Sequence, residues 1–95
     1  MKKNVLVFIP CLNEASTISI VIKNIKKNLP HANIIVYDND STDETSKIAK
    51  KNGAKVRKVF ERGKGNVVRK MFSDNHQYSY YVMVDGDNTY NLSNL

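Results

Sequence analysis

Four short apolar runs, separated by helix-forming or polar segments, constrain the fold of this 95-residue chain more than any other feature. They span residues 5–10, 34–37, 55–60 and 80–84. Continuous runs rich in β-branched residues are typical of strands buried on both faces. The third run alternates, which indicates a less buried strand. Strands that alternate with helices predict an α/β fold, a three-layer, Rossmann-like parallel sheet of about four strands.

The first helix is predicted from the apolar residues at positions 18, 21, 22, 25 and 29, which form one stripe at helical spacing. Asn13 or Ser16 can cap the start of this helix, and Pro30 ends it. Pro10 in the same way is expected to end the first strand.

Ser41 and Glu44, three residues apart, predict a capping box at the start of the second helix. Gly53 suits a left-handed position at the end of that helix. The third helix is expected to open at Gly63-Lys64-Gly65 and to face the core with Val67, Val68, Met71 and Phe72.

The composition is that of one small globular domain, with 41% hydrophobic and 25% charged residues. No run approaches 18 apolar residues, so we expect no membrane segment in this chain. The first residues carry no signal cleavage pattern, which favours a cytoplasmic location. Membrane association of the full-length protein stays open. Cys11 is the single cysteine, which excludes an intrachain disulfide, and it is predicted to be a small buried side chain.

The net charge of +6 is concentrated in the middle of the chain. Residues 51–80 carry eight basic and two acidic side chains. Such a stretch suggests an anionic ligand, although solvated helix faces explain most charge of this kind more often than not. The interleaved aromatic and basic residues of a nucleic-acid-stacking surface are missing, so no nucleic acid partner is predicted.

The segments that follow the predicted strands hold the residues suited to chemistry. In open α/β sheets, ligands bind beyond the carboxyl ends of the strands, where the strand order reverses. Acidic residues follow three of the four runs, and Gly63-Lys64-Gly65 follows the other. Carboxylates suit a hard divalent cation, while glycine and lysine suit phosphate. Together these segments predict a diphosphate-plus-cation ligand.

Each of these residues also has a plainer explanation. Asp85 and Asp87 flank Gly86, so both carboxylates can point at one Mg²⁺ or Mn²⁺ ion, but the same triplet suits a surface turn. Asp38 directly follows a strand and can accept hydrogen bonds from a base or ribose, or it can complement a helix dipole. Lys64 can contact phosphate or lie solvated in a loop.

Four segments together resemble family 2 glycosyltransferases in order and spacing, over essentially the whole chain. Residues 7–14 resemble the family's opening strand and Pro-x-x-Asn-Glu turn, and residues 35–45 its VVDDGSTDGT segment. Residues 63–66 are similar to its G-K-G-x-A segment, and residues 84–87 to its D-x-D motif.

The resemblance implies the N-terminal half of a GT-A fold and inverting transfer from a nucleoside-diphosphate sugar, UDP- or GDP-linked, with Mg²⁺ or Mn²⁺. It assigns no catalytic base, which is expected beyond residue 95. Asp87 would bind the metal, and Asp85 the ribose or the metal. The resemblance further places Pro10, Asn13, Glu14, Asp38 and Lys64 at the nucleotide sugar.

The chain also departs from the family pattern. Leu12 stands where many members have tyrosine, and Asn39 replaces a frequent second aspartate. The G-K-G-N and D-x-D segments are closest to the polyprenyl-phosphate branch, but Thr89 stands where that branch often has glutamine. We expect residues 1–95 to form a nucleotide-sugar-binding subdomain, truncated after the D-x-D motif, that binds the donor without full transfer. An exposed sheet edge would also favour self-association.

Two other classes share this architecture. A sugar nucleotidyltransferase would carry a glycine-rich basic loop after the first strand, where this chain has Cys11-Leu12-Asn13-Glu14. A non-enzymatic receiver-type module would use Asp38 as phosphoacceptor, with an acidic pair after the first strand that Glu14 matches poorly.

Overall fold

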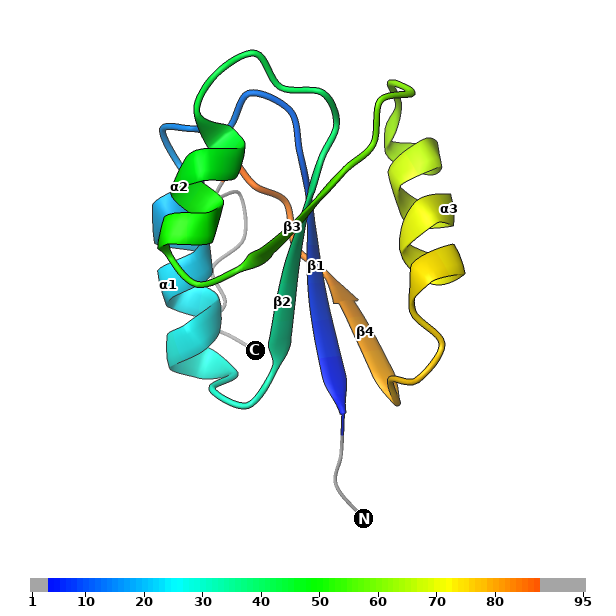
Figure 1. The fold of residues 1–95 in the computed structure, drawn as a ribbon. Coiled ribbons are helices and arrows are strands. Elements are labelled where there is room, and N and C mark those ends of the chain that lie inside the picture. The colour runs from blue at the N-terminus through cyan, green and yellow to red at the C-terminus, as the bar shows by residue number, and fades with distance from the viewer. Residues whose placement is uncertain (1–3, 88–95) are drawn as a thin grey trace.

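The computed structural model describes residues 4–87, in which four strands alternate with three helices (Figure 1). All strand pairs are parallel, and the strand order is β3-β2-β1-β4. The predicted α/β fold with a four-stranded parallel sheet is therefore confirmed. The elements are β1 (Val5–Cys11), α1 (Ile18–Asn28), β2 (Asn33–Asp38), α2 (Thr45–Lys51), β3 (Lys55–Lys58), α3 (Lys64–Asp74) and β4 (Tyr80–Met83).

The sheet lies between two helical layers, with α1 and α2 on one face and α3 on the other (Figure 1). Strand β1 is central and apolar on both sides. Its Val7 and Ile9 belong to the core cluster that includes residues of α1 and α2. Leu6 and Phe8, which alternate with them, belong to the cluster that includes α3. This alternation explains why the first apolar run is continuous.

The prediction that Pro10 ends the first strand is wrong, because β1 continues through Pro10 to Cys11. The backbone groups of successive β1 residues point alternately toward β4 and β2. The Phe8 carbonyl accepts a hydrogen bond from the N–H of Val84, after β4, and the Cys11 carbonyl accepts one from the N–H of Asn39, after β2. The nitrogen of Pro10 therefore faces the β4 side, where pairing with β1 ends at Phe8. Proline costs no ladder hydrogen bond at such a position.

The predicted cap of α1 is also wrong. The N-cap residue is Thr17, which makes no side-chain capping bond, rather than Asn13 or Ser16. Helix α1 ends at Asn28, two residues before Pro30, as predicted.

The capping box at the start of α2 does not form. The N-cap residue is Glu44, and Ser41 instead accepts a hydrogen bond from the backbone N–H of Asn13, at 2.8 Å. The side chain of Asp43 accepts from the N–H of Thr45, at 3.0 Å. Gly53 has φ 92°, so its predicted left-handed conformation after α2 is confirmed.

Strand β3 ends at Lys58, shorter than the predicted run to residue 60, and all its residues except Val56 are exposed. On α3, Val67 and Met71 are buried as predicted and Val68 packs beside them. Phe72 is 49% exposed, so the prediction that it faces the core is wrong.

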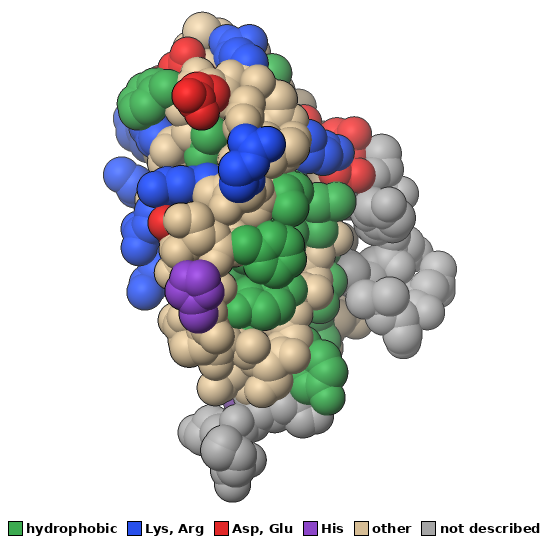
Figure 2. Space-filling model, turned by 90° about the vertical axis from the view of Figure 1, so that its right-hand side faces the viewer, with side chains coloured by type: hydrophobic (Ala, Val, Ile, Leu, Met, Phe, Trp, Pro, Cys, Tyr) green, Lys and Arg blue, Asp and Glu red, His purple; other side chains and the backbone are tan. Residues whose placement is uncertain are grey.

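Hydrophobic side chains gather on the side of the molecule formed by α3 and β4 (Figure 2). Phe72 and Met83 are the large exposed hydrophobic side chains on the α3 face of the sheet, and we call them the apolar patch. No helix within residues 4–87 is long and apolar enough to cross a membrane. Thr89, which stands where the polyprenyl-phosphate branch often has glutamine, lies outside the described residues.

Candidate functional site

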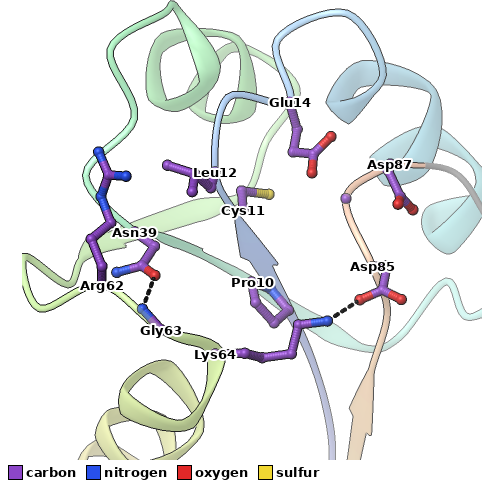
Figure 3. A pocket seen from close by; sticks show the side chains of 11 residues that line it. Pro10, Cys11, Leu12, Glu14, Asn39, Arg62, Gly63, Lys64, Asp85 and Asp87 are labelled. Atoms are coloured by element: carbon purple, nitrogen blue, oxygen red, sulfur yellow. Dashed lines mark hydrogen bonds and ion pairs between the residues drawn. The ribbon is translucent and has the colours of Figure 1, made fainter.

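A cleft of about 360 Å³ opens at the carboxyl ends of the strands (Figure 3). The chain builds outward from β1 to β2 and β3, and β4 is then added on the other side of β1. The strand order thus reverses between β1 and β4, the point where open α/β sheets bind ligands. The last residues of β1 and the segments after all four strands line the cleft, through Pro10, Cys11, Leu12, Glu14, Asn39, Arg62, Gly63, Lys64, Asp85, Gly86 and Asp87.

The cleft carries opposite charges on two sides (Figure 3). Glu14, Asp85 and Asp87 form an acidic wall, and Arg62 and Lys64 form a cationic wall. The walls meet where Lys64 Nζ lies 3.0 Å from Asp85 Oδ1. Partial burial raises the pKa of Glu14, and the charges of Asp87, Asp43 and Asp85 raise it further. The acidic wall therefore holds closely spaced negative charge.

The turn at residues 85–87 packs tightly on the loop after β1. The hydroxyl of Thr17 donates to the carbonyl of Gly86 at 2.6 Å. A Cβ at Gly86 would lie 2.6 Å from Cys11 Sγ and 3.2 Å from Glu14 Cγ. Glycine is therefore required at this turn by close approach, since its φ is not positive.

The acidic wall offers only oxygen donors, which suit Mg²⁺ or Mn²⁺ better than softer metals. Within residues 4–87, no three His, Cys, Asp or Glu side chains converge as a preformed metal centre. Such cations commonly take one or two carboxylates, and phosphate and water oxygens complete their shell. Asp85 and Asp87, on either side of Gly86, fit this arrangement.

Two of the predicted nucleotide-sugar residues do not line the cleft. Asp38 is 1% exposed, and its carboxylate accepts hydrogen bonds from the N–H of Ser41 at 2.9 Å and from the hydroxyl of Ser46. The side chain of Asn13 accepts from the N–H of Thr42 at 2.9 Å. Both residues stabilise the loops around the cleft in this structure. Pro10, Glu14, Lys64, Asp85 and Asp87 do line it.

Asn39 is a site residue that the sequence analysis noted only as a departure. It is 6% exposed, and its amide donates to the carbonyls of Val59 at 2.8 Å and Glu61 at 2.9 Å. Its side-chain oxygen accepts from the N–H of Gly63 at 2.9 Å. These three bonds hold the loop that presents Arg62 to the cleft.

Arg62 was not predicted as a site residue, although it belongs to the basic stretch and precedes Gly63. Its guanidinium donates to the carbonyl of Asp40 at 3.2 Å. Leu12 lies on the same side of the cleft (Figure 3). Cys11 is 2% exposed, as predicted. Burial first, and then the charges of nearby carboxylates, raise the pKa of its thiol, so Cys11 stays protonated.

Comparison with known proteins identifies the family. The model of glycosyl transferase family 2 matches residues 6–95. The protein RfbJ of Shigella flexneri is 52% identical over 90 residues, which are 95% of this chain and 69% of RfbJ. The glycosyltransferase AglJ of Haloferax volcanii is 41% identical over 86 residues, 90% of this chain and 28% of AglJ.

Solved structures agree with the sequence comparison. Glucosyl-3-phosphoglycerate synthase from Mycobacterium tuberculosis, solved in complex with UDP, superposes with a TM-score of 0.78 at 28% identity. The match covers 90% of this chain and 34% of the synthase, so the chain corresponds to about a third of that protein. These matches decide against the nucleotidyltransferase and receiver-type alternatives. The chain, with its cleft at the switch point of the sheet, belongs to glycosyl transferase family 2.

Proposed function

We propose that these 95 residues bind a nucleoside-diphosphate sugar together with a divalent cation, as the donor-binding half of an inverting glycosyltransferase. The observation that carries the proposal is the arrangement of charge in the cleft. A cationic wall of Arg62 and Lys64 faces an acidic wall that ends in Asp87. A diphosphate that carries a bound cation has the complementary pattern, with anionic oxygens on one side and positive charge on the other.

Each wall has a separate task in this proposal. Lys64 and Arg62 contact the diphosphate oxygens, because a guanidinium and an ammonium are the usual partners of phosphate. Asp87 and Asp85 hold the cation, with Asp85 also within reach of the ribose. The bound cation would neutralise the negative charge that develops on the departing nucleoside diphosphate. Pro10 and Leu12 supply an apolar surface for the nucleoside at the end of β1.

The tight loops around the cleft support preorganised binding. Asp38 and Asn13 use their side chains within the protein, so we propose that they shape the nucleoside pocket by fixing loops. Direct contact of either residue with the nucleotide would require those bonds to rearrange. The side chain of Glu14 belongs to the acidic wall. Its backbone N–H donates a hydrogen bond to the Thr45 hydroxyl at 3.0 Å, which fixes the loop.

Related structures support the same ligand class. Glucosyl-3-phosphoglycerate synthase has been solved with Mn²⁺ and UDP-glucose, and with Mn²⁺, UDP and glucosyl-3-phosphoglycerate. Because this chain superposes on that enzyme, a UDP-linked sugar and Mn²⁺ are the first ligands to test, with GDP and Mg²⁺ as alternatives. Membership of the polyprenyl-phosphate branch and a cytoplasmic location both stay predictions.

Isothermal titration calorimetry with UDP and GDP, each with and without Mn²⁺, tests the proposal. We expect one nucleotide to bind with a clear dependence on Mn²⁺, and Asp87→Ala to abolish that dependence. Glu44→Gln is the matched control, because Glu44 is exposed and lies at the N-cap of α2, outside the lining of the cleft. The proposal fails if neither nucleotide binds, or if Asp87→Ala binds as the wild type does.

We also propose that residues 1–95 alone do not complete the transfer reaction. The chain corresponds to 34% of the synthase on which it superposes. A radiolabel assay with donor and candidate acceptors would contradict this part of the proposal if the 95-residue chain transferred sugar by itself.

A further inference from the structure

We infer that Thr17 is a positioning residue for the cation, and that its hydroxyl presents the turn at residues 85–87 to the cleft. This inference rests on the proposed function of the cleft. Thr17 does not line the cleft and belongs to none of the motifs singled out in the sequence. Its contact with the turn joins two segments that lie 69 residues apart.

The hydroxyl of Thr17 is used in an unusual way. A threonine at the N-cap of a helix normally accepts a hydrogen bond from an N–H in the first turn, which stabilises the helix. Thr17 is the N-cap residue of α1 but makes no such bond. Its hydroxyl instead donates to the Gly86 carbonyl at 2.6 Å, while the Glu14 carbonyl lies farther away, at 3.4 Å. The Glu14 carboxylate is a further acceptor close to this hydroxyl. The hydroxyl has one hydrogen, and the 2.6 Å contact with the Gly86 carbonyl is the shortest hydrogen bond that it makes.

Gly86 is the residue through which this bond can act on the acidic wall. Asp85 and Asp87 are its chain neighbours, so the orientation of the Gly86 peptide constrains the backbone from which both carboxylates project. The turn also packs against Cys11 Sγ and Glu14 Cγ, with no room for a Cβ. In this inference, packing sets how closely the turn approaches β1, and the Thr17 hydrogen bond restricts its rotation.

Loss of the Thr17 hydroxyl is expected to affect binding of the cation more than binding of the nucleotide. Thr17 contacts the turn of the acidic wall, whereas Arg62 lies in a loop held by other contacts and Lys64 is the first residue of α3. Loss of its hydroxyl should weaken cation binding and leave contacts between the nucleotide and the cationic wall intact. A residue that only stabilised the fold would affect both equally.

Thr17→Val tests the inference, because valine keeps the shape of threonine and removes the hydroxyl. We expect the Kd for Mn²⁺, measured by calorimetry in the presence of UDP, to rise about fivefold, the effect of one typical hydrogen bond. The Kd for UDP without metal should stay within about twofold, and Thr17→Ser should restore Mn²⁺ binding. Ser19→Ala is the matched control, since it removes a hydroxyl of α1 that bonds to Asn52 instead.

Three results would overturn the inference while the proposed function stood. They are unchanged Mn²⁺ binding by Thr17→Val, a Thr17→Ser variant as weak as Thr17→Val, and an equal loss of metal-free UDP binding. If Thr17→Val does not fold, Thr17→Cys is measured against the same criteria. If the wild type shows no metal-dependent UDP binding, the proposed function fails and the role of Thr17 falls with it.

Discussion

Lys64 Nζ lies 3.0 Å from Asp85 Oδ1, so an ion pair joins the first residue of α3 to the segment after β4 across the cleft. The side chains of Lys64 and Asp85 are 57% and 25% exposed. Exposed ion pairs contribute at most about 1 kcal/mol to stability. The pair therefore adds little to folding stability, and it lies at the part of the cleft where we propose that a diphosphate and its cation meet.

Lys64→Ala should lower the affinity for the nucleoside diphosphate about tenfold, since a charged hydrogen bond to phosphate is lost. The melting temperature should change little. Calorimetry and thermal unfolding measure the two effects. Lys47→Ala is the control, because it removes an exposed pair with Glu44 outside the cleft. Equal binding by Lys64→Ala and Lys47→Ala would contradict a role for Lys64 at the phosphates.

Gly86→Ala should destabilise the fold by about 1–3 kcal/mol, because the added Cβ would lie 2.6 Å from Cys11 Sγ. Cys11→Ala removes that sulfur, so the double variant should recover part of the loss. Urea unfolding of the wild type, both single variants and the double variant gives the coupling energy. Strictly additive effects would show that the turn does not press on Cys11 as described.

Asn39→Asp should loosen the loop before α3. An aspartate cannot donate to the carbonyls of Val59 and Glu61, which the Asn39 amide now satisfies. The expected loss is about 1–3 kcal/mol for the unsatisfied groups, while the Gly63 N–H keeps an acceptor oxygen. Thermal unfolding measures the loss. An unchanged melting temperature would show that the two bonds donated by Asn39 do not hold this loop.

Asp43 should stabilise the protein in a pH-dependent way. Slight desolvation pushes the pKa of Asp43 up, but hydrogen bonds from Thr45 and Ala15 outweigh it and hold this pKa below its usual range. A lowered pKa in the folded state stabilises above the unfolded value of about 3.9, and this stabilisation is lost as pH falls through the folded value.

Asp43→Asn should accordingly be less stable than the wild type at neutral pH, and the two should converge in strong acid. Urea unfolding across the acid range measures the difference. A difference that stayed constant from neutral pH to well below the usual aspartate pKa would refute this account of Asp43.

The apolar patch should promote self-association. Phe72 and Met83 are each more than two-fifths exposed, on the side of the molecule where hydrophobic side chains gather (Figure 2). Sedimentation velocity should show a concentration-dependent increase in mass, which Phe72→Ser reduces. Ile20→Ser, at a residue 50% exposed on α1, is the matched control. A wild type that stays monomeric at all concentrations would argue against the prediction.

Sequence periodicity was sufficient to predict the parallel sheet and its three layers, because burial on both faces leaves a continuous apolar run in β1 and β2. The details that failed depend on tertiary neighbours. Whether Pro10 costs a hydrogen bond depends on where β4 stops. Whether Ser41 caps α2 depends on Asn13, which lies 28 residues earlier in the chain. Local sequence propensity gives no information on the end of β4 or on the contact between Asn13 and Ser41.

Some residues of the cleft could likewise be predicted from the sequence, and others could not. Lys64, Asp85 and Asp87 were predicted because ligand-binding side chains follow strands in this fold class. Asn39 and Thr17 act through backbone carbonyls and N–H groups that any sequence would supply, so no residue pattern marks their partners. Asp38 has the expected residue type, but its carboxylate is occupied by Ser41 and Ser46. Only the folded structure shows that protein groups occupy the acceptor oxygens of Asp38.

Paramagnetic broadening of amide signals by Mn²⁺ tests the central claim most directly, because broadening falls off steeply with distance from the ion. The ¹⁵N-labelled chain is titrated with Mn²⁺ in the presence of UDP or GDP. The account predicts broadening centred on Asp85, Gly86 and Asp87, with Glu14 next, and its loss in Asp87→Ala. Broadening centred on acidic residues outside the cleft, such as Glu44 or Asp74, would contradict the account.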